Sequence, residues 1–171
     1  MRKYDVSVIR YAVYEGDNEL LGVAEVNLPS LEFLTQTVNG SGIAGEIESI
    51  LIGQMKAMEI TFKWLVLTER GIALSSPEVH TVEIRECQQT VEDNGTLEPT
   101  GVKHIIKMLP KKMDGGNLKP HSTSDPSTSA SVLYWAEHRD GEKLLELDPL
   151  NDKCFINGTD YLEPVRKALG K

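Results

Sequence analysis

The fold class of this chain is decided by residues 58–64, MEITFKW, in which apolar and polar residues alternate. The apolar positions are Met58, Ile60, Phe62 and Trp64. A period of two places them on one face of a β-strand and the intervening polar residues on the other face. Strands of a parallel sheet are buried on both faces and carry continuous apolar runs instead. The stretch therefore predicts an antiparallel sheet with one face in water.

A glycine-rich segment precedes this strand and has the spacing G-x-G-x-x-G. It consists of Gly40, Ser41, Gly42, Ile43, Ala44 and Gly45. A dinucleotide-binding loop with this pattern lies between a buried strand and a helix, inside a βαβ unit. Residues 46–55 contain Gly53 and no clear helix cap, and an alternating strand follows them. We therefore interpret the segment as a flexible loop, with a small-molecule-binding module as the alternative.

Strand-like segments recur at hairpin spacing along the rest of the chain. They cover residues 4–14, 20–28, 80–91, 101–109, 131–148 and 154–160. Asp-Gly at 140–141 and Asn-Gly at 157–158 are the residue pairs that tight hairpin turns favour. This pattern predicts a single domain over residues 1–171 that is mainly β, an antiparallel β-sandwich or barrel with one or two short helices.

The two helices are expected near Thr68–Leu74 and at the end of the chain. In the terminal segment, Asp160 and Glu163 are spaced as a variant of the capping box, and Pro164 falls in the first turn. Two stretches rich in small and polar residues, 39–49 and 113–131, are predicted to be mobile.

The charge and composition of the chain limit its function. It has 171 residues, a net charge of −8 and a pI near 5.0. Gripping nucleic acid requires clustered Lys and Arg, so an acidic chain is a poor candidate for that task. No apolar run approaches the length of a membrane span, and residues 1–14 do not have the pattern of a signal peptide. We expect no membrane anchor.

No group of residues in the sequence indicates catalysis. His80, Glu83 and Cys87 could suggest a metal site, but on a strand His80 and Glu83 point to opposite faces. We expect a protein that is not an enzyme, with no catalytic, cofactor-binding or metal-binding residues and no cofactor. Cys87 and Cys154 are predicted to be reduced thiols.

Four segments, in this order and spacing, resemble a known family. They are GVAEVNLPSL (22–31), NGSGIAG (39–45), MEITFKW, and the ending ELDPLNDKCFINGTDYLEPVRKALG (146–170). Together they resemble the major tail tube proteins of contractile-tailed phages and of related phage-tail-like particles. Residues 65–79 are shorter than the helical segment expected of that family at this place.

The resemblance implies a structural protein of the virion tail. Six β-sandwich protomers would close into a hexameric ring, and rings would stack head to tail into the inner tube of a contractile tail. The implied partners are other copies of the chain, a tail sheath protein, a tape measure protein and a baseplate initiator. DNA would pass through the tube without sequence-specific binding. The tube of a DNA-free contractile bacteriocin or a secretion-type injection machine is the alternative, because one fold can serve both tasks.

Two sets of residues are predicted to act in such a tube. The first is an inter-ring stacking loop that would order on the adjacent ring. Its residues are Asn39, Gly40, Ser41, Gly42, Ile43, Ala44, Gly45, Ile50, Leu51, Ile52 and Met55. The second set is Glu59 and Glu83, whose carboxylates would face the bore and repel phosphate.

The linear distribution of charge indicates two further surfaces. Basic residues gather at 101–121, and acidic residues gather at 137–152. The basic set is Lys103, Lys107, Lys111, Lys112 and Lys119, and the acidic set is Glu137, Asp140, Glu142, Glu146, Asp148 and Asp152. Opposite charge on separate surfaces would suit the heterologous contacts of a head-to-tail stack.

Overall fold

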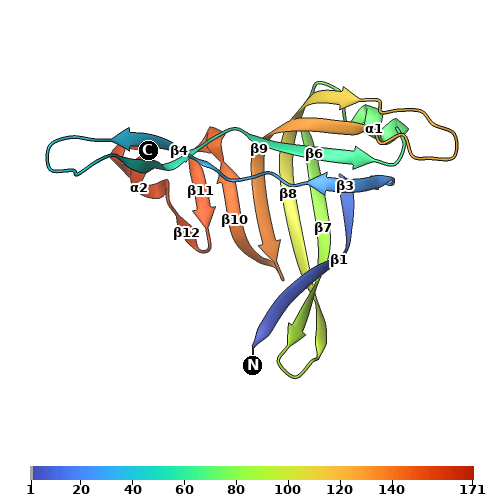
Figure 1. Cartoon of the computed structure of the whole chain (residues 1–171), viewed down its shortest axis with the longest axis horizontal. Helices are drawn as coiled ribbons and strands as arrows, with labels where there is room; N and C mark the ends of the chain where they lie inside the picture. The colour runs from blue at the N-terminus through green and yellow to red at the C-terminus, as the bar shows by residue number, and fades with distance from the viewer. Residues whose placement is uncertain (1) are drawn as a thin grey trace.

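A computed structural model describes residues 2–171 and shows a mainly antiparallel β-fold (Figure 1). Its strands are β1 (Lys3–Glu15), β2 (Asn18–Glu19), β3 (Val23–Asn27), β4 (Phe33–Val38), β5 (Ile47–Met55), β6 (Met58–Trp64), β7 (His80–Glu92), β8 (Leu97–Asp114), β9 (Ser127–Arg139), β10 (Glu142–Asp148), β11 (Lys153–Ile156) and β12 (Thr159–Asp160). The helices are α1 (Glu69–Ala73), the 3₁₀-helix η1 (Pro149–Asn151) and α2 (Glu163–Ala168).

Most strands belong to one continuous sheet, whose order is β12-β11-β10-β9-β8-β7-β1-β2. Strand β9 also pairs with β6 along its first half, from Met58↔Val132 to Lys63↔Ser127, and β6 pairs in turn with β3. Strands β3 and β6 therefore form a second layer, which runs across the long strands β7, β8 and β9 (Figure 1). The predicted antiparallel sandwich is confirmed.

The core lies between these two layers. Strand β6 buries its four alternating apolar residues, with Ile60 and Phe62 fully inaccessible, as the sequence predicts. From the opposite layer, Val82, Ile106 and Leu147 complete the same cluster. The Trp64 indole Nε1 donates a hydrogen bond of 3.2 Å to the Thr128 Oγ1, so this large side chain is buried without an unpaired polar atom.

Both short helices form where the sequence predicts them. The side chain of Thr68 caps α1 by accepting a hydrogen bond of 3.1 Å from the Gly71 N–H. The capping box predicted for α2 is wrong, because the cap position is Leu162, which has no side-chain cap. Asp160 lies two residues too early and instead accepts a 3.1 Å hydrogen bond from the Leu162 N–H and a 2.7 Å bond from Arg166.

Residues 23–64 form one long, interrupted hairpin. At its base β3 pairs with β6, and farther out β4 pairs only with β5. We call β4, β5 and the turn between them, residues 33–55, the arm; it projects beyond the main sheet at the left of Figure 1. The prediction of a continuous loop over 39–55 is wrong from Ile47 onward, because residues 47–55 pair with β4 as a strand that contains three β-branched isoleucines.

Candidate assembly interface

The arm exposes apolar side chains that its own chain does not cover. The exposed fractions are 52% for Ile47, 56% for Ile50 and 61% for Ile52. Both outer edges of the arm are free of strand pairing, since β4 and β5 pair only with each other. Unpaired edges and exposed apolar residues together are a template for another strand.

The root of the arm rests on the C-terminal helix. Gly53 has φ +67°, and a Cβ at this position would lie 2.4 Å from the Leu162 Cδ2. Glycine is therefore required here both by the backbone conformation and by the close approach. Beside this contact an apolar groove runs under the arm, lined by Phe33, Ile50, Ile52, Gly53, Ile156 and Tyr161.

The predicted stacking residues occupy two different parts of the arm. The residues from Asn39 to Gly45 form its tip, where the Ile43 N–H donates a 3.1 Å hydrogen bond to the Gly40 carbonyl. Residues Ile50, Leu51 and Ile52 lie along β5 with exposed side chains, whereas Met55 is partly buried at the root. The G-x-G-x-x-G pattern thus joins two antiparallel strands without a following helix, which contradicts the arrangement needed for dinucleotide binding.

The sequence analysis missed a second exposed apolar strand, the first half of β1. Exposed fractions there are 53% for Tyr4, 58% for Val6, 54% for Val8 and 51% for Ile9. Strand β7 pairs with one edge of β1, but β2 covers the other edge only at Tyr14 and Glu15. Within residues 2–171 no strand pairs with the outer edge from residue 3 to residue 12, and we call this stretch the β1 edge.

A sequence signal for this surface existed in the apolar pattern of β1. Tyr4, Val6 and Val8 occupy even positions, whereas Ile9 and Val13 occupy odd ones. Such a change of phase marks an extra residue in a strand, and the structure has register shifts between Asp5 and Ser7 and between Val8 and Arg10. After these shifts Val8 lies on the same face as Val13, and only Val13 is buried. Tyr4 lies on the other face, so the first half of β1 exposes apolar side chains on both faces.

The two predicted bore-lining carboxylates lie in different layers. Glu59 is on β6, in an ion pair with Lys111 of β8, while Glu83 is on β7, with an Oε1 atom 2.5 Å from the Arg85 Nε. Their strand neighbours, Ile60 and Val82, point into the same core. The two carboxylates therefore lie on the outer faces of opposed layers, and each is paired with a cation.

The outer face of the β3–β6 layer is rich in hydroxyl groups. Neighbouring strands pair here in one row of residues across the face, which consists of Asn27, Thr61, Ser129 and Lys112. The Thr61 Oγ1 and the Ser129 Oγ are 3.3 Å apart, and Lys63 pairs with Glu25 at 3.1 Å on the next row. This face presents small polar groups, two ion pairs and Lys112, which lies outside the ion pairs formed within residues 2–171.

The basic and acidic stretches predicted as separate surfaces adjoin at one end. The hairpin register places Lys103 opposite His138, so that the first lysines of β8 lie beside the acidic end of β9 and β10, whereas Lys112 lies opposite Ser129 at the other end of the hairpin. Glu146 bonds locally to Lys143 and accepts a 2.9 Å hydrogen bond from the Tyr134 hydroxyl. Burial and this hydrogen bond raise the pKa of Tyr134 to about 12. Charge in this region is compensated within the protomer.

The histidine considered as a metal ligand has a structural role. The His80 Nδ1 lies 2.5 Å from the Glu15 Oε1, and the His80 Nε2 lies 3.1 Å from the Ser76 carbonyl oxygen. Burial opposes the charged ring, but these two hydrogen bonds outweigh it and raise the pKa of His80. Over residues 2–171 there is no His, Cys, Asp and Glu cluster that could hold a metal ion. Cys87 and Cys154 are both free thiols.

The helices in the described part of the chain are all too short or too polar to cross a membrane.

Solved structures with this fold come from an extracellular contractile injection system. Its PVC sheath/tube terminator superposes with a TM-score of 0.56 at 16% identity, covering 79% of this chain and 97% of that one. A chain of the PVC sheath-tube complex gives a TM-score of 0.55 at 17% identity, covering 79% and 92%. At this identity the likeness establishes the fold alone.

The sequence comparisons identify the family. The chain is 26% identical over 152 residues to the tail tube protein of Escherichia phage P2, which covers 87% of this chain and 88% of the relative. The family model for phage tail tube protein FII matches residues 6–170, nearly the whole domain. The chain therefore belongs to the phage tail tube protein FII family, and its role is that of a structural component of a contractile tail tube.

Proposed function

We propose that six copies of this chain close into a ring and that the rings stack head to tail into the inner tube of a contractile tail. The observation that carries this proposal is the pair of open strand surfaces, on the arm and on the β1 edge. A monomer gains nothing from exposing Ile50, Ile52, Tyr4 and Val8, whereas an assembly buries them. The two surfaces differ from each other, as head-to-tail contacts require.

The sheath, the tape measure protein and the baseplate initiator are the further partners of this proposal. The sheath would surround the tube, the tape measure protein would set its length, and the baseplate initiator would start its growth. The tube needs one contact with each of them. The similarity to the phage P2 tail tube protein favours a tube that conducts DNA over the tube of a DNA-free bacteriocin or secretion-type machine. Within the assembled tube, the tip of the arm at Asn39–Gly45 reaches the adjacent ring.

We assign the bore to the outer face of the β3–β6 layer, which carries Glu59. Its hydroxyl groups and mutually neutralised charges offer a phosphate backbone no unpaired cation cluster to bind, so DNA would slide along it. Glu83 then faces away from the bore, because it lies on the opposite layer. The bore is nearly neutral on this assignment, in contrast to the acidic lining that the net charge of −8 had led us to expect.

Negative-stain electron microscopy of the purified chain over a range of concentrations tests the assembly. Rings or hollow tubes are the expected result. Monomers that persist at every concentration, and in the presence of tail baseplates, would refute the proposal.

Labelling of preformed tubes tests the bore assignment separately. In a Cys87→Ser background, Ser129→Cys places a thiol on the assigned face and Glu83→Cys places one on the opposite layer. A maleimide on a polymer too large to enter the tube should leave Ser129→Cys unmodified. The reverse pattern would place Glu83 in the bore.

A further inference from the structure

The arm and the β1 edge have complementary charge as well as exposed apolar side chains. The arm, residues 33–55, contains two charged residues, Glu46 and Glu48, and no Lys or Arg. The β1 edge and the residue before it contain Arg2, Lys3, Asp5 and Arg10, which leaves this strand basic in a protein of net charge −8.

Two of the basic side chains are available to a partner. Lys3 is held by Glu98 at 2.7 Å, and Asp5 is held by Arg139 at 2.7 Å. The ion pairs within residues 2–171 include none to the side chains of Arg2 or Arg10, which are exposed. Glu46 and Glu48 are likewise exposed and lie outside those ion pairs.

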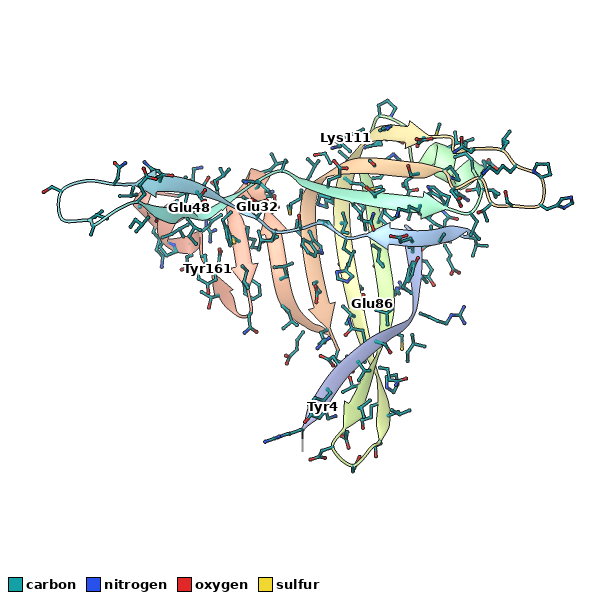
Figure 2. The ribbon with its side chains drawn as sticks, in the orientation of Figure 1. Tyr4, Glu32, Glu48, Glu86, Lys111 and Tyr161 are labelled. Carbon is teal, nitrogen blue, oxygen red and sulfur yellow. The ribbon has the colours of Figure 1, made fainter. Side chains whose placement is uncertain are left out.

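The two surfaces cannot meet within one protomer. Figure 2 shows Glu48 on the arm at one end of the molecule and Tyr4 at the far end of β1, with the whole sheet between them. Each surface has an unpaired strand edge, apolar side chains more than half exposed, and charge of a single sign available for pairing. A strand that adds to an open edge gains main-chain hydrogen bonds, and the side chains determine which strand fits.

We propose that the arm of one protomer adds as a strand to the β1 edge of a second copy of this chain. The pairing covers apolar side chains on both faces of the arm, with Ile50 and Ile52 on one face and Ile47 on the other. On β1, Val8 and Tyr4 likewise lie on opposite faces. The same pairing places Glu46 and Glu48 beside Arg2 and Arg10. This inference rests on the proposed function. It adds to the proposed tube the surface that receives the arm. It also explains why β1 keeps an open apolar edge that β2 covers only at its end.

The register shifts along both surfaces restrict the pairing. Strand β1 has shifts between Asp5 and Ser7 and between Val8 and Arg10, and the arm has one between Phe33 and Thr35. Bulges twist an edge and discourage pairing with an arbitrary flat strand. An edge that is apolar, open and irregular therefore fits one particular partner strand.

Charge reversal tests this contact. The arm variant Glu46→Lys/Glu48→Lys and the edge variant Arg2→Glu/Arg10→Glu should each raise the protein concentration needed for assembly by about tenfold or more, because like charges would then face each other. The variant that carries all four changes should assemble near the original concentration. Asp17→Lys/Glu69→Lys, at exposed positions in the turn after β1 and in the first turn of α1, controls for net charge and should leave assembly unchanged.

Sedimentation velocity and electron microscopy give the readout, with circular dichroism to verify that each variant is folded. If the unmodified chain forms no rings or tubes, the proposed function fails. If it forms them, and either reversed pair assembles as the unmodified chain does, this inference alone is overturned. The inference would also be overturned if the fourfold variant assembled no better than the single-surface variants. Where two surfaces contact each other directly, reversing the charge on both should restore assembly.

Discussion

Replacing Gly53 with alanine probes how the arm is attached to the body of the protomer. The added Cβ would lie 2.4 Å from the Leu162 Cδ2 and 2.5 Å from its Cγ, and Leu162 is only 3% exposed, so it has little room to move. The backbone at φ +67° adds a second cost, about 1–2 kcal/mol for a residue with a side chain. Overpacking of a filled site adds about 1–3 kcal/mol. We expect a total loss of about 2–5 kcal/mol in the free energy of unfolding.

Gly42→Ala is the matched control for this substitution. Gly42 also has a positive φ, +88°, but nothing lies within 4 Å of a Cβ placed there. It should therefore show only the backbone cost, about 1–2 kcal/mol. The gain from a less flexible unfolded chain applies to both variants and cancels in the comparison. The difference between them isolates the contact with Leu162.

Urea unfolding followed by tryptophan fluorescence measures both variants, under dilute conditions in which the protomer is monomeric. Trp64 and Trp135 are 1% and 8% exposed, so unfolding changes the environment of both. Combining Gly53→Ala with Leu162→Ala should give a loss smaller than the sum of the two by about 1–3 kcal/mol, because the second change removes the clashing atoms. Equal losses for Gly53→Ala and Gly42→Ala would refute the reasoning, since the arm would then not rest on Leu162.

Three further outcomes follow from the core and from the buried ion pairs. Phe62→Ala, at a fully buried position, should cost about 3–5 kcal/mol in urea unfolding, whereas Lys63→Ala on the opposite face should cost less than about 1 kcal/mol. The raised pKa of His80 means that its contribution to stability is complete below its ordinary value of 6.5 and is lost as pH rises through the folded-state pKa. The melting temperature should accordingly fall as the pH rises through that range, and it should fall less in the Glu15→Gln variant. An equal fall in Glu15→Gln would show that another group is responsible. Asp160→Ala, which removes the acceptor for Leu162 and Arg166, should lower the free energy of unfolding by about 1–3 kcal/mol and loosen α2, detectable by faster hydrogen exchange there.

The parts of the fold that could be predicted from sequence are those set by local chemistry. Asp140 and Gly141, with φ +47° and +86°, form the turn between β9 and β10 that their residue types favour. The alternation along β6 likewise identified the buried residues, because one face of a strand contacts one core. Thr68 marked the start of α1 for a similar reason, since its side chain satisfies a backbone N–H three residues away.

The parts that could not be predicted depend on contacts between distant residues. The stretch 47–55 resembled a loop because of its glycine and its place after a glycine-rich turn, yet pairing with β4 makes it a strand. Part of the segment predicted to be mobile, 113–131, is strand for the same reason, as β8 extends to Asp114 and β9 begins at Ser127. Linear charge clusters were also misleading, because antiparallel register places Lys103 beside the acidic end of β9 but Lys112 at the opposite end of the same hairpin.

The charge pattern of the two open surfaces also excludes the symmetric contacts that would end growth. Two β1 edges placed against each other would bring Arg2 and Arg10 together, and two arms would bring Glu46 and Glu48 together. A symmetric contact uses the same patch on both copies and closes at a dimer, whereas a contact between two different patches continues into a ring or a filament. Repulsion between like surfaces and attraction between unlike surfaces therefore both favour the contact between an arm and a β1 edge. If the proposed contact is correct, the exposed apolar strands have one favourable partner, and pairing with it extends the assembly.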